Sequence, residues 1–159
     1  MLLGQRYNPT VSLRAPQFWA FSPNRRPGTP RFPPMKLHLA NTAGLNIFTA
    51  YGDGYVAINT QRHEGNLIVL PQSLFTGWTT ATPASLTEAD MAKLLALGTE
   101  IVLLGTGRQL RFPPGALLRP FAPAGIGLEV MDLQAACRTY NILAQEGRDV
   151  AVALLLETA

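Results

Sequence analysis

The stretch from Gly125 to Arg148 constrains the fold of this chain more than any other part of the sequence. It begins with a mostly apolar segment, residues 126–131, which we predict to be a buried β-strand. Asp132 follows, and an aspartate placed directly before a helical pattern accepts hydrogen bonds from the free amides of the first turn. Apolar residues then recur at helical spacing through residue 146. A buried strand that runs straight into a capped helix indicates an α/β fold.

Two further apolar runs set the order of the elements. Residues 100–105 form a short run that ends in glycine, and residues 150–156 form another within a predicted strand over residues 148–156. Continuous runs of this length are typical of strands that are covered on both faces. A helix that Thr87 caps and Gly98 ends precedes them, and Pro113 opens a short helix between strands. This alternation of strands and helices predicts a mostly parallel sheet with helices packed on it.

The region before residue 86 has antiparallel features instead. Asp53-Gly54 separates two apolar runs, residues 45–51 and 55–59, and glycine supplies the positive φ that a tight hairpin turn requires. Residues 67–71 are predicted to form a third strand, which a proline closes. We therefore predict that the α/β fold carries an amino-terminal antiparallel hairpin. We expect residues 75–85 to be an irregular connection.

Residues 1–34 differ in composition from the rest of the chain. They hold seven of the 13 prolines, five arginines and no acidic residue, and they show no apolar period. Such a segment buries too little apolar surface to offset the entropy of ordering. We therefore predict a disordered leader, followed by a single α/β domain over residues 35–159. Three explanations for the leader stay open: a start codon assigned in error upstream of Met35, an organelle transit peptide, or an interaction tail. We favour the first, which predicts a cytoplasmic bacterial protein, whereas a transit peptide would direct the chain to the mitochondrial matrix.

Charge and cysteine content argue against several classes of function. Residues 35–159 hold eight basic and ten acidic side chains, so the positive net charge of the chain comes from the leader and predicts no nucleic-acid partner. No apolar run approaches the ~20 residues of a membrane-spanning helix, so we expect no membrane insertion. Cys137 is the single cysteine, and His38 and His63 lie on separate segments. We therefore expect no disulfide, no metal and no other cofactor.

The carboxyl ends of two predicted strands define a candidate site. If residues 100–104 and 126–131 are parallel neighbours, their ends open on one edge, where α/β sheets usually bind ligands. A glycine-flanked turn then lies beside Asp132, and glycine on both sides of Thr106 lets another chain or a ligand approach its amides. The alternative, that these glycines only end a strand and that Asp132 only caps the helix, stays open. The turn consists of Gly105, Thr106, Gly107 and Arg108.

The helix after Asp132 adds two candidate binding residues. Arg138 and Asn141 lie on a polar stripe beside the apolar face of this helix, and an arginine there can bind a carboxylate through two parallel hydrogen bonds. An ordinary solvated helix surface is the alternative for this stripe. Cys137 lies on the apolar face, where nothing lowers the pKa of a thiol, so we expect it to be buried and inert. We assign no catalytic residue.

Four motifs carry a resemblance to a known family. They are Tyr51-Gly-Asp-Gly-Tyr55, Leu103-Leu-Gly-Thr-Gly107 with Arg111-Phe-Pro113, Ile126-Gly-Leu-Glu-Val-Met-Asp132, and Ala135-Ala-Cys-Arg-Thr-Tyr-Asn-Ile-Leu143. Together they resemble a small domain family of unknown function that includes the mitochondrial respiratory complex I assembly factor 3 and an adipogenesis-associated cytosolic protein. The resemblance covers residues 35–157. It implies a bacterial member with a three-layer fold, a mixed central sheet with parallel core strands and two to three helices.

The resemblance also shapes the functional hypothesis. Leu110 and Leu133 stand where relatives often carry Gln and Thr, so a polar site that spans them would lose two hydrogen-bonding groups. Our leading hypothesis is a non-enzymatic protein-binding or assembly module with an unidentified protein partner. The sequence does not indicate its oligomeric state. By resemblance, we link this module to respiratory complex I assembly. The alternative is a small-molecule binder or enzyme that uses the Gly105–Arg108 turn, Asp132 and Arg138.

Overall fold

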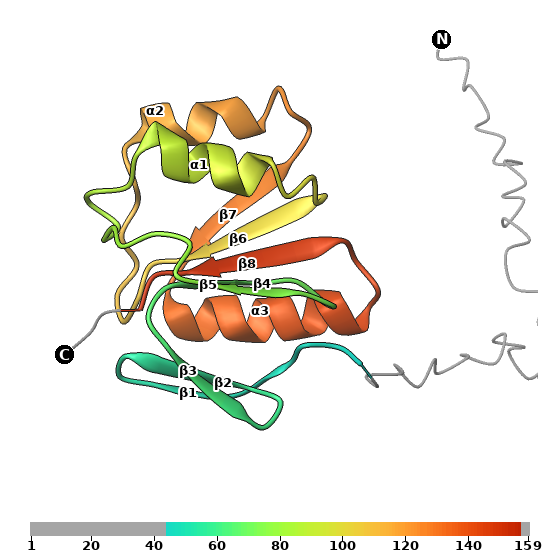
Figure 1. Cartoon of the computed structure of the whole chain (residues 1–159). Helices are drawn as coiled ribbons and strands as arrows, with labels where there is room; N and C mark the ends of the chain where they lie inside the picture. The colour runs from blue at the N-terminus through green and yellow to red at the C-terminus, as the bar shows by residue number, and fades with distance from the viewer. Residues whose placement is uncertain (1–43, 157–159) are drawn as a thin grey trace, which may run out of the picture. The chain divides into compact units, whose positions relative to one another are not determined.

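The computed structural model describes residues 44–156, so the predicted leader lies outside the described residues. Eight strands and three α-helices follow one another along this part of the chain (Figure 1). The order is β1 (Phe48–Gly52), β2 (Tyr55–Ile58), β3 (Gln61–Glu64), β4 (Leu67–Val69), β5 (Leu74–Thr76), α1 (Glu88–Leu95), β6 (Ile101–Gly105), α2 (Gly115–Leu118) with the 3-10 turn η1 (Arg119–Phe121), β7 (Gly127–Met131), α3 (Leu133–Gln145) and β8 (Val150–Leu154).

Five of these strands form a mixed sheet in the order β5-β4-β8-β6-β7. The strands β8, β6 and β7 are parallel, whereas β4 is antiparallel to both β8 and β5. Ile101 pairs with Gly127 and Gly105 pairs with Met131, so the two strands that define the candidate site are parallel neighbours, as predicted. The mixed sheet with parallel core strands is thereby confirmed.

The predicted hairpin belongs to a separate three-stranded sheet in the order β1-β2-β3. Gly54 occupies the tight turn with φ 72°, the conformation for which glycine was expected. Two short strands were not predicted. All four residues of β3 are polar, so it has no apolar alternation, and β5 occupies the start of the segment that we expected to be irregular.

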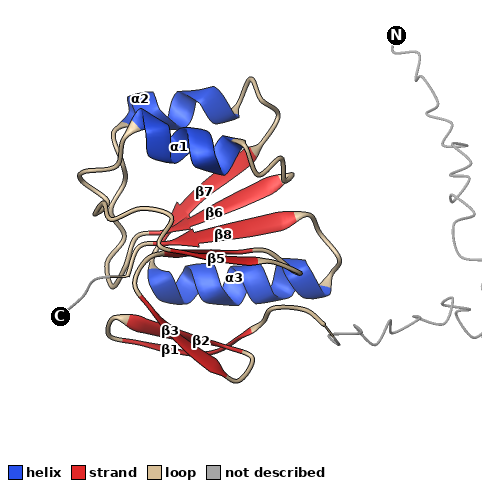
Figure 2. Ribbon diagram, in the orientation of Figure 1, coloured by secondary structure: helices blue, strands red, loops and turns tan. Residues whose placement is uncertain are grey.

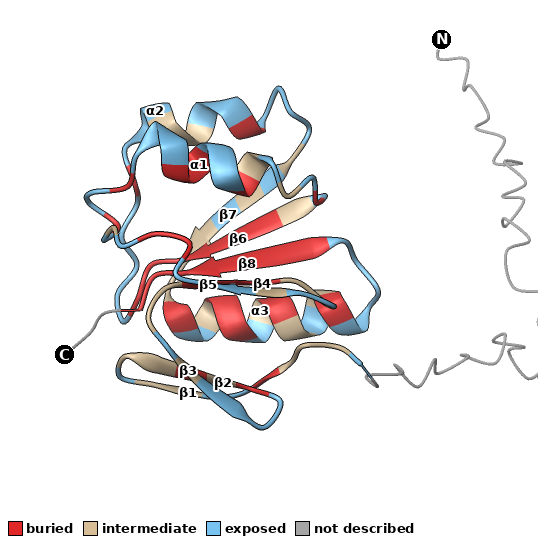
Figure 3. Ribbon diagram, in the orientation of Figure 1, coloured by how far each residue is buried: buried red, intermediate tan, exposed pale blue. Residues whose placement is uncertain are grey.

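The five-stranded sheet is covered on both faces (Figure 2). Helices α1 and α2 lie on one face, and α3 lies on the other together with the three-stranded sheet. Side chains of β8 alternate between the two layers, so that Val150, Val152 and Leu154 join the cluster with α3, while Ala153 joins the cluster with α1. All five residues of β8 are fully buried (Figure 3). This is the three-layer α/β arrangement that we predicted.

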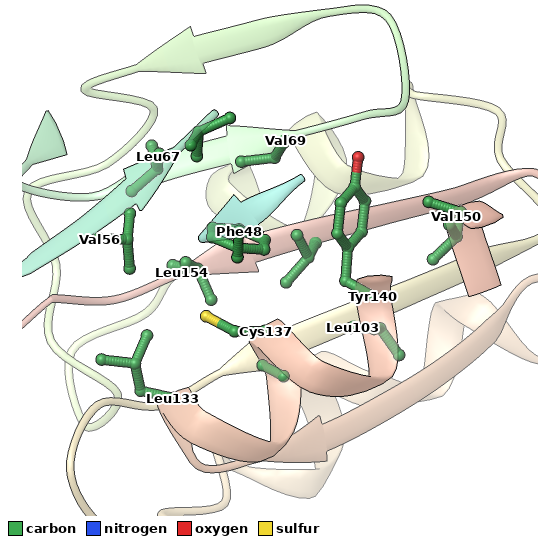
Figure 4. Packing of buried hydrophobic residues seen from close by; sticks show 14 of the residues in the cluster. Phe48, Val56, Leu67, Val69, Leu103, Leu133, Cys137, Tyr140, Val150 and Leu154 are labelled. Atoms are coloured by element: carbon green, nitrogen blue, oxygen red, sulfur yellow. The ribbon is translucent and has the colours of Figure 1, made fainter. Parts of the chain in front are cut away.

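Tyr140 belongs to the α3 cluster (Figure 4). Its ring is fully buried and meets Phe48 edge to face, with the ring centroids 5.3 Å apart. The Tyr140 hydroxyl has no hydrogen-bond partner among the described residues, and burial raises its pKa. The ring therefore stabilises the core, whereas the hydroxyl carries an uncompensated desolvation cost.

We expect the Tyr140→Phe variant to be more stable than the natural chain by about 1 kcal/mol, because the substitution removes an unpaired buried hydroxyl and keeps the ring. Urea denaturation monitored by circular dichroism measures the difference. Tyr51→Phe is the matched control, because Tyr51 is only half-buried and its stability should change little. A clear loss of stability in Tyr140→Phe would show that the hydroxyl has a partner in solution.

Candidate functional site

The Gly-Thr-Gly turn after β6 is held from inside the protein. The Thr106 hydroxyl lies 3.0 Å from the Gln109 carbonyl oxygen and 3.2 Å from that of Met131, and it accepts a hydrogen bond from the Arg111 amide at 3.0 Å. Thr106 itself is fully buried. Its hydroxyl therefore fixes the path of residues 106–111 and faces no open pocket.

Gly105 serves the packing of α3 against the sheet. A Cβ atom at this position would lie 2.5 Å from Leu154 Cδ2, so this buried side chain would have to move, and it would make a tight contact of 3.1 Å with the Cβ of Ala136. Glycine is thus needed because the helix and β8 approach the backbone of β6 closely. The alternative reading of this glycine, as a structural residue at the end of a strand, explains its presence without a ligand.

Asp132 and the turn are brought together as the sequence indicated. The Asp132 carboxylate accepts a hydrogen bond from the Ala135 amide at 2.8 Å and so caps α3. The next residue, Leu133, donates its amide to the Gly107 carbonyl at 2.8 Å. The amino terminus of α3 is therefore attached directly to the Gly-Thr-Gly turn.

Arg108 leaves this turn toward the tip of the β1–β2 hairpin. Its guanidinium lies 3.3 Å from the Asp53 carboxylate, and both side chains are about two-thirds exposed. An ion pair this exposed contributes little to stability. Arg108 therefore remains accessible on the surface.

Asn141 connects α3 to β1. Its side-chain amide donates to the Phe48 carbonyl at 2.8 Å, and its side-chain oxygen accepts from the Phe48 amide at 2.9 Å. The side chain thus makes the pair of hydrogen bonds that a neighbouring strand would make with β1. This role was not predicted, because 93 residues separate the two positions and no sequence period connects them.

Arg138 and Cys137 are neighbours in sequence and lie in opposite environments. Arg138 is exposed and makes no hydrogen bond or ion pair within residues 44–156. Because Thr106 is buried, it shares no open pocket with Arg138.

Burial raises the pKa of the Cys137 thiol to about 12; the charge of Arg138 lowers this pKa and that of Asp132 raises it. A thiol with this pKa is protonated at neutral pH and is a poor nucleophile.

A pocket also opens near this edge of the sheet. This pocket of about 660 Å³ opens beside the carboxyl end of β8, within the size range of small-molecule sites. The pocket lies near the edge that the sequence analysis selected, but its lining residues were not predicted, because most of them belong to the segment after β5 that carries no periodic pattern. The pocket is lined by Gly65, Asn66, Gly77, Thr79, Thr80, Ala81, Thr82, Pro83, Arg111, Leu155 and Leu156.

Residues 44–156 contain no group of three or more His, Cys, Asp or Glu side chains that could hold a metal ion. No helix among these residues is both long enough and apolar enough to cross a bilayer.

Comparison with known proteins identifies the family. Residues 48–155 match the family described as "Protein of unknown function (DUF498/DUF598)". The chain belongs to this family. The match begins with β1 and ends just after β8, so it covers every strand and helix of the described fold.

Named relatives connect the family to an assembly factor. The NADH dehydrogenase (ubiquinone) 1 alpha subcomplex assembly factor 3 of Bos taurus is 32% identical over 108 residues, which are 67% of this chain and 58% of that protein. A "13 kDa major membrane protein" of Francisella tularensis is 34% identical over 71 residues, 45% of this chain and 58% of that protein. The resemblance that the sequence motifs indicated is thereby confirmed, and the chain spans less than two-thirds of these relatives.

A solved bacterial structure shows the same fold. The crystal structure of a Bordetella parapertussis protein has 41% sequence identity and a TM-score of 0.67, and it covers 72% of this chain and 98% of its own. The DUF498 domain described here therefore corresponds to nearly the whole of that bacterial protein.

We expect Asn141→Ala to lower the free energy of unfolding by about 2 kcal/mol, because the backbone amide and carbonyl of Phe48 would lose their partners in a half-buried setting. Urea denaturation measures the stability, and hydrogen exchange at the Phe48 amide locates the effect. Gln145→Ala is the matched control, since Gln145 is exposed on the same helix. Equal stability of the two variants would contradict the anchoring role.

We expect Cys137 in the folded chain to resist alkylation by iodoacetamide from pH 7 to pH 9. An exposed thiol, with a pKa near 8.5, reacts faster as pH rises through this range, whereas burial holds the pKa of Cys137 at about 12 and keeps it protonated. Mass spectrometry of the labelled protein measures the rate, and the urea-unfolded chain is the control. Labelling of the native chain that rises with a midpoint near pH 8.5 would contradict this prediction.

Proposed function

We propose that this chain is a non-enzymatic protein-binding module that assists the assembly of a larger complex. The observation that carries the proposal is its 32% identity, across the family domain, to a protein named as an assembly factor. By the same likeness, we propose respiratory complex I as the complex that it serves. Because the matched region is 58% of that relative, this role is proposed for the shared domain alone.

The geometry of the predicted site supports binding over catalysis. Thr106 is used to hold the turn, Asp132 to cap α3 and Asn141 to anchor β1. Cys137 is buried with a raised pKa. These side chains shape the surface, and none of them is positioned as a nucleophile or a general base.

The contact surface that we propose is the apolar loop, which we define as residues 108–112. Leu110 is 50% exposed and Phe112 is 68% exposed, although both are large hydrophobic side chains. Arg108 is exposed beside them. Aromatic and arginine side chains are enriched among the residues that dominate protein–protein binding. Gly105, Thr106 and Gly107 would set the path of this loop.

Arg138 would contribute a separate charged contact from α3. It is exposed, and the described residues offer it no ion pair. A partner carboxylate could bind it through two parallel hydrogen bonds.

Small-molecule binding is a second candidate function, and the 660 Å³ pocket favours it. Its walls combine apolar side chains with threonines and Arg111, a mixture that suits an organic ligand. Mass spectrometry of the purified protein after denaturation tests this function directly. A small molecule recovered in stoichiometric amount would support it. If no small molecule is recovered, protein binding remains as the one proposed function.

We expect the double variant Leu110→Ser with Phe112→Ser to reduce recovery of bound partner proteins at least about tenfold, because each lost apolar contact weakens binding by more than about 1 kcal/mol at such positions. Affinity purification of the tagged chain from the native host, quantified by mass spectrometry, measures the loss. Thermal denaturation verifies that the variant is folded.

Ile142→Ser is the matched control for this experiment. Ile142 is 58% exposed, and it lies about 14 Å along α3 from the helix end that contacts Gly107. The control should keep the partners that the natural chain captures. If the loop variant keeps them too, the apolar loop is not the contact surface. If neither the natural chain nor the control captures a specific partner, the assembly role itself is wrong.

A further inference from the structure

The strand β7 is an unpaired edge of the five-stranded sheet. It pairs with β6 on one side, and no strand within residues 44–156 lies on its other side. Figure 3 shows β7 with exposed and half-buried residues, whereas its neighbour β6 is mostly buried. The five residues of β7 are therefore accessible along one side.

The outer side of β7 presents four main-chain hydrogen-bonding groups. The Gly127 amide donates to the Glu100 carbonyl at 2.9 Å, and the Met131 carbonyl accepts from the Thr106 amide at 2.9 Å, so both residues turn these groups toward β6. Backbone groups of a strand alternate sides from one residue to the next. The amides and carbonyls of Leu128 and Val130 therefore point away from the sheet.

The other sheet edges in the described part of the chain are protected. The strand β3 carries an ion pair between Arg62 and Glu64 at 3.0 Å, and charged edges discourage strand pairing. The strand β5 has only three residues. The outer side of β1 is occupied at Phe48 by the Asn141 side chain. Of these edges, β7 is the one that is long and unblocked.

The side chains of β7 specify what could pair with it. Leu128 and Val130 are half-buried against the α1 layer, so their outer sides offer apolar contact to an added strand. Glu129 points to the opposite face of the sheet, is exposed and makes no ion pair within residues 44–156. An added strand with a basic side chain beside Glu129 and apolar side chains on either side of it would match this pattern.

A second copy of this chain matches the edge poorly. In an antiparallel pair of two β7 strands, the register that uses all four free groups of each copy sets Leu128 opposite Val130 and therefore Glu129 opposite Glu129. The two Glu129 residues would then form a non-hydrogen-bonded pair, in which the Cα atoms are only about 4.5 Å apart. Like charges directly opposite destabilise strand pairing. Glu129 therefore disfavours self-association and favours a partner that carries a cation.

We propose that β7 is a strand-addition site that binds an extended segment of a partner protein with a basic residue opposite Glu129 between apolar residues. Main-chain hydrogen bonds to Leu128 and Val130 would supply affinity, and the charge of Glu129 would supply register and selectivity. This site goes beyond the apolar loop and does not depend on it.

The test uses the ¹⁵N-labelled full chain and two synthetic probes. One probe is the capped peptide Thr-Val-Thr-Val-Lys-Val-Thr-Val-Thr, and the other has Glu in place of Lys. We expect the lysine peptide at millimolar concentration to slow hydrogen exchange at the Leu128 and Val130 amides. Exchange at Gly127, Glu129 and Met131, whose amides already face β6, should not change.

The charge preference gives the second readout. The lysine peptide should bind about fivefold more tightly than the glutamate peptide, and Glu129→Lys, a change at an exposed position, should invert that preference. Three results would overturn the proposal: no added protection of the Leu128 and Val130 amides, equal affinity for the two peptides, or protection of these amides before any peptide is added. The last result would show that the edge is already covered by the chain itself or by a second copy.

Discussion

The burial of β8 between two layers is the constraint on which the rest of the structure depends. All five residues of this strand are fully buried, and their side chains alternate between the α3 cluster and the α1 cluster. Its neighbours are β4 on one side and β6 on the other, which lie in distant parts of the sequence. Neither core can therefore form completely until β8 is in place. The segments at the carboxyl ends of the strands are attached to β8 and to the residues directly after it.

Polar side chains near β8 serve mainly as internal attachments. The Asn66 amide donates to the carbonyls of Thr79 and Ala81, and its oxygen accepts from the Leu156 amide at 2.8 Å. The Trp78 indole donates to the Leu154 carbonyl in the same way. Thr106 repeats this use after β6. Because these groups already have partners inside the protein, a partner of the kind proposed above would be recognised by exposed apolar side chains, surface charges and unpaired main-chain groups.

The sequence predicted those parts of the structure that depend on continuous burial or on local capping. Strong apolar runs identified β6, β7 and β8 together with their parallel order, and Asp132 identified the start of α3. The strand β3 was missed because none of its residues is apolar, and its place in the sheet depends on pairing with β2. Asn141 was selected as a binding candidate from its position on a polar stripe. Its bonds to Phe48 arise from tertiary packing, which helical periodicity does not encode.

The two proposed contact surfaces meet at the carboxyl end of β7. The Thr106 amide donates a hydrogen bond to the carbonyl of Met131, the last residue of β7. The Thr106 hydroxyl lies within hydrogen-bonding distance of the carbonyl of Gln109, which belongs to the apolar loop. A segment paired with β7 and extended past Met131 would therefore enter the neighbourhood of that loop. Hydrogen bonds along β7 do not depend on partner sequence, whereas Glu129 and the apolar loop do discriminate between side chains. An assembly module with this arrangement could select a partner segment by charge and apolar contact and hold it through its main chain.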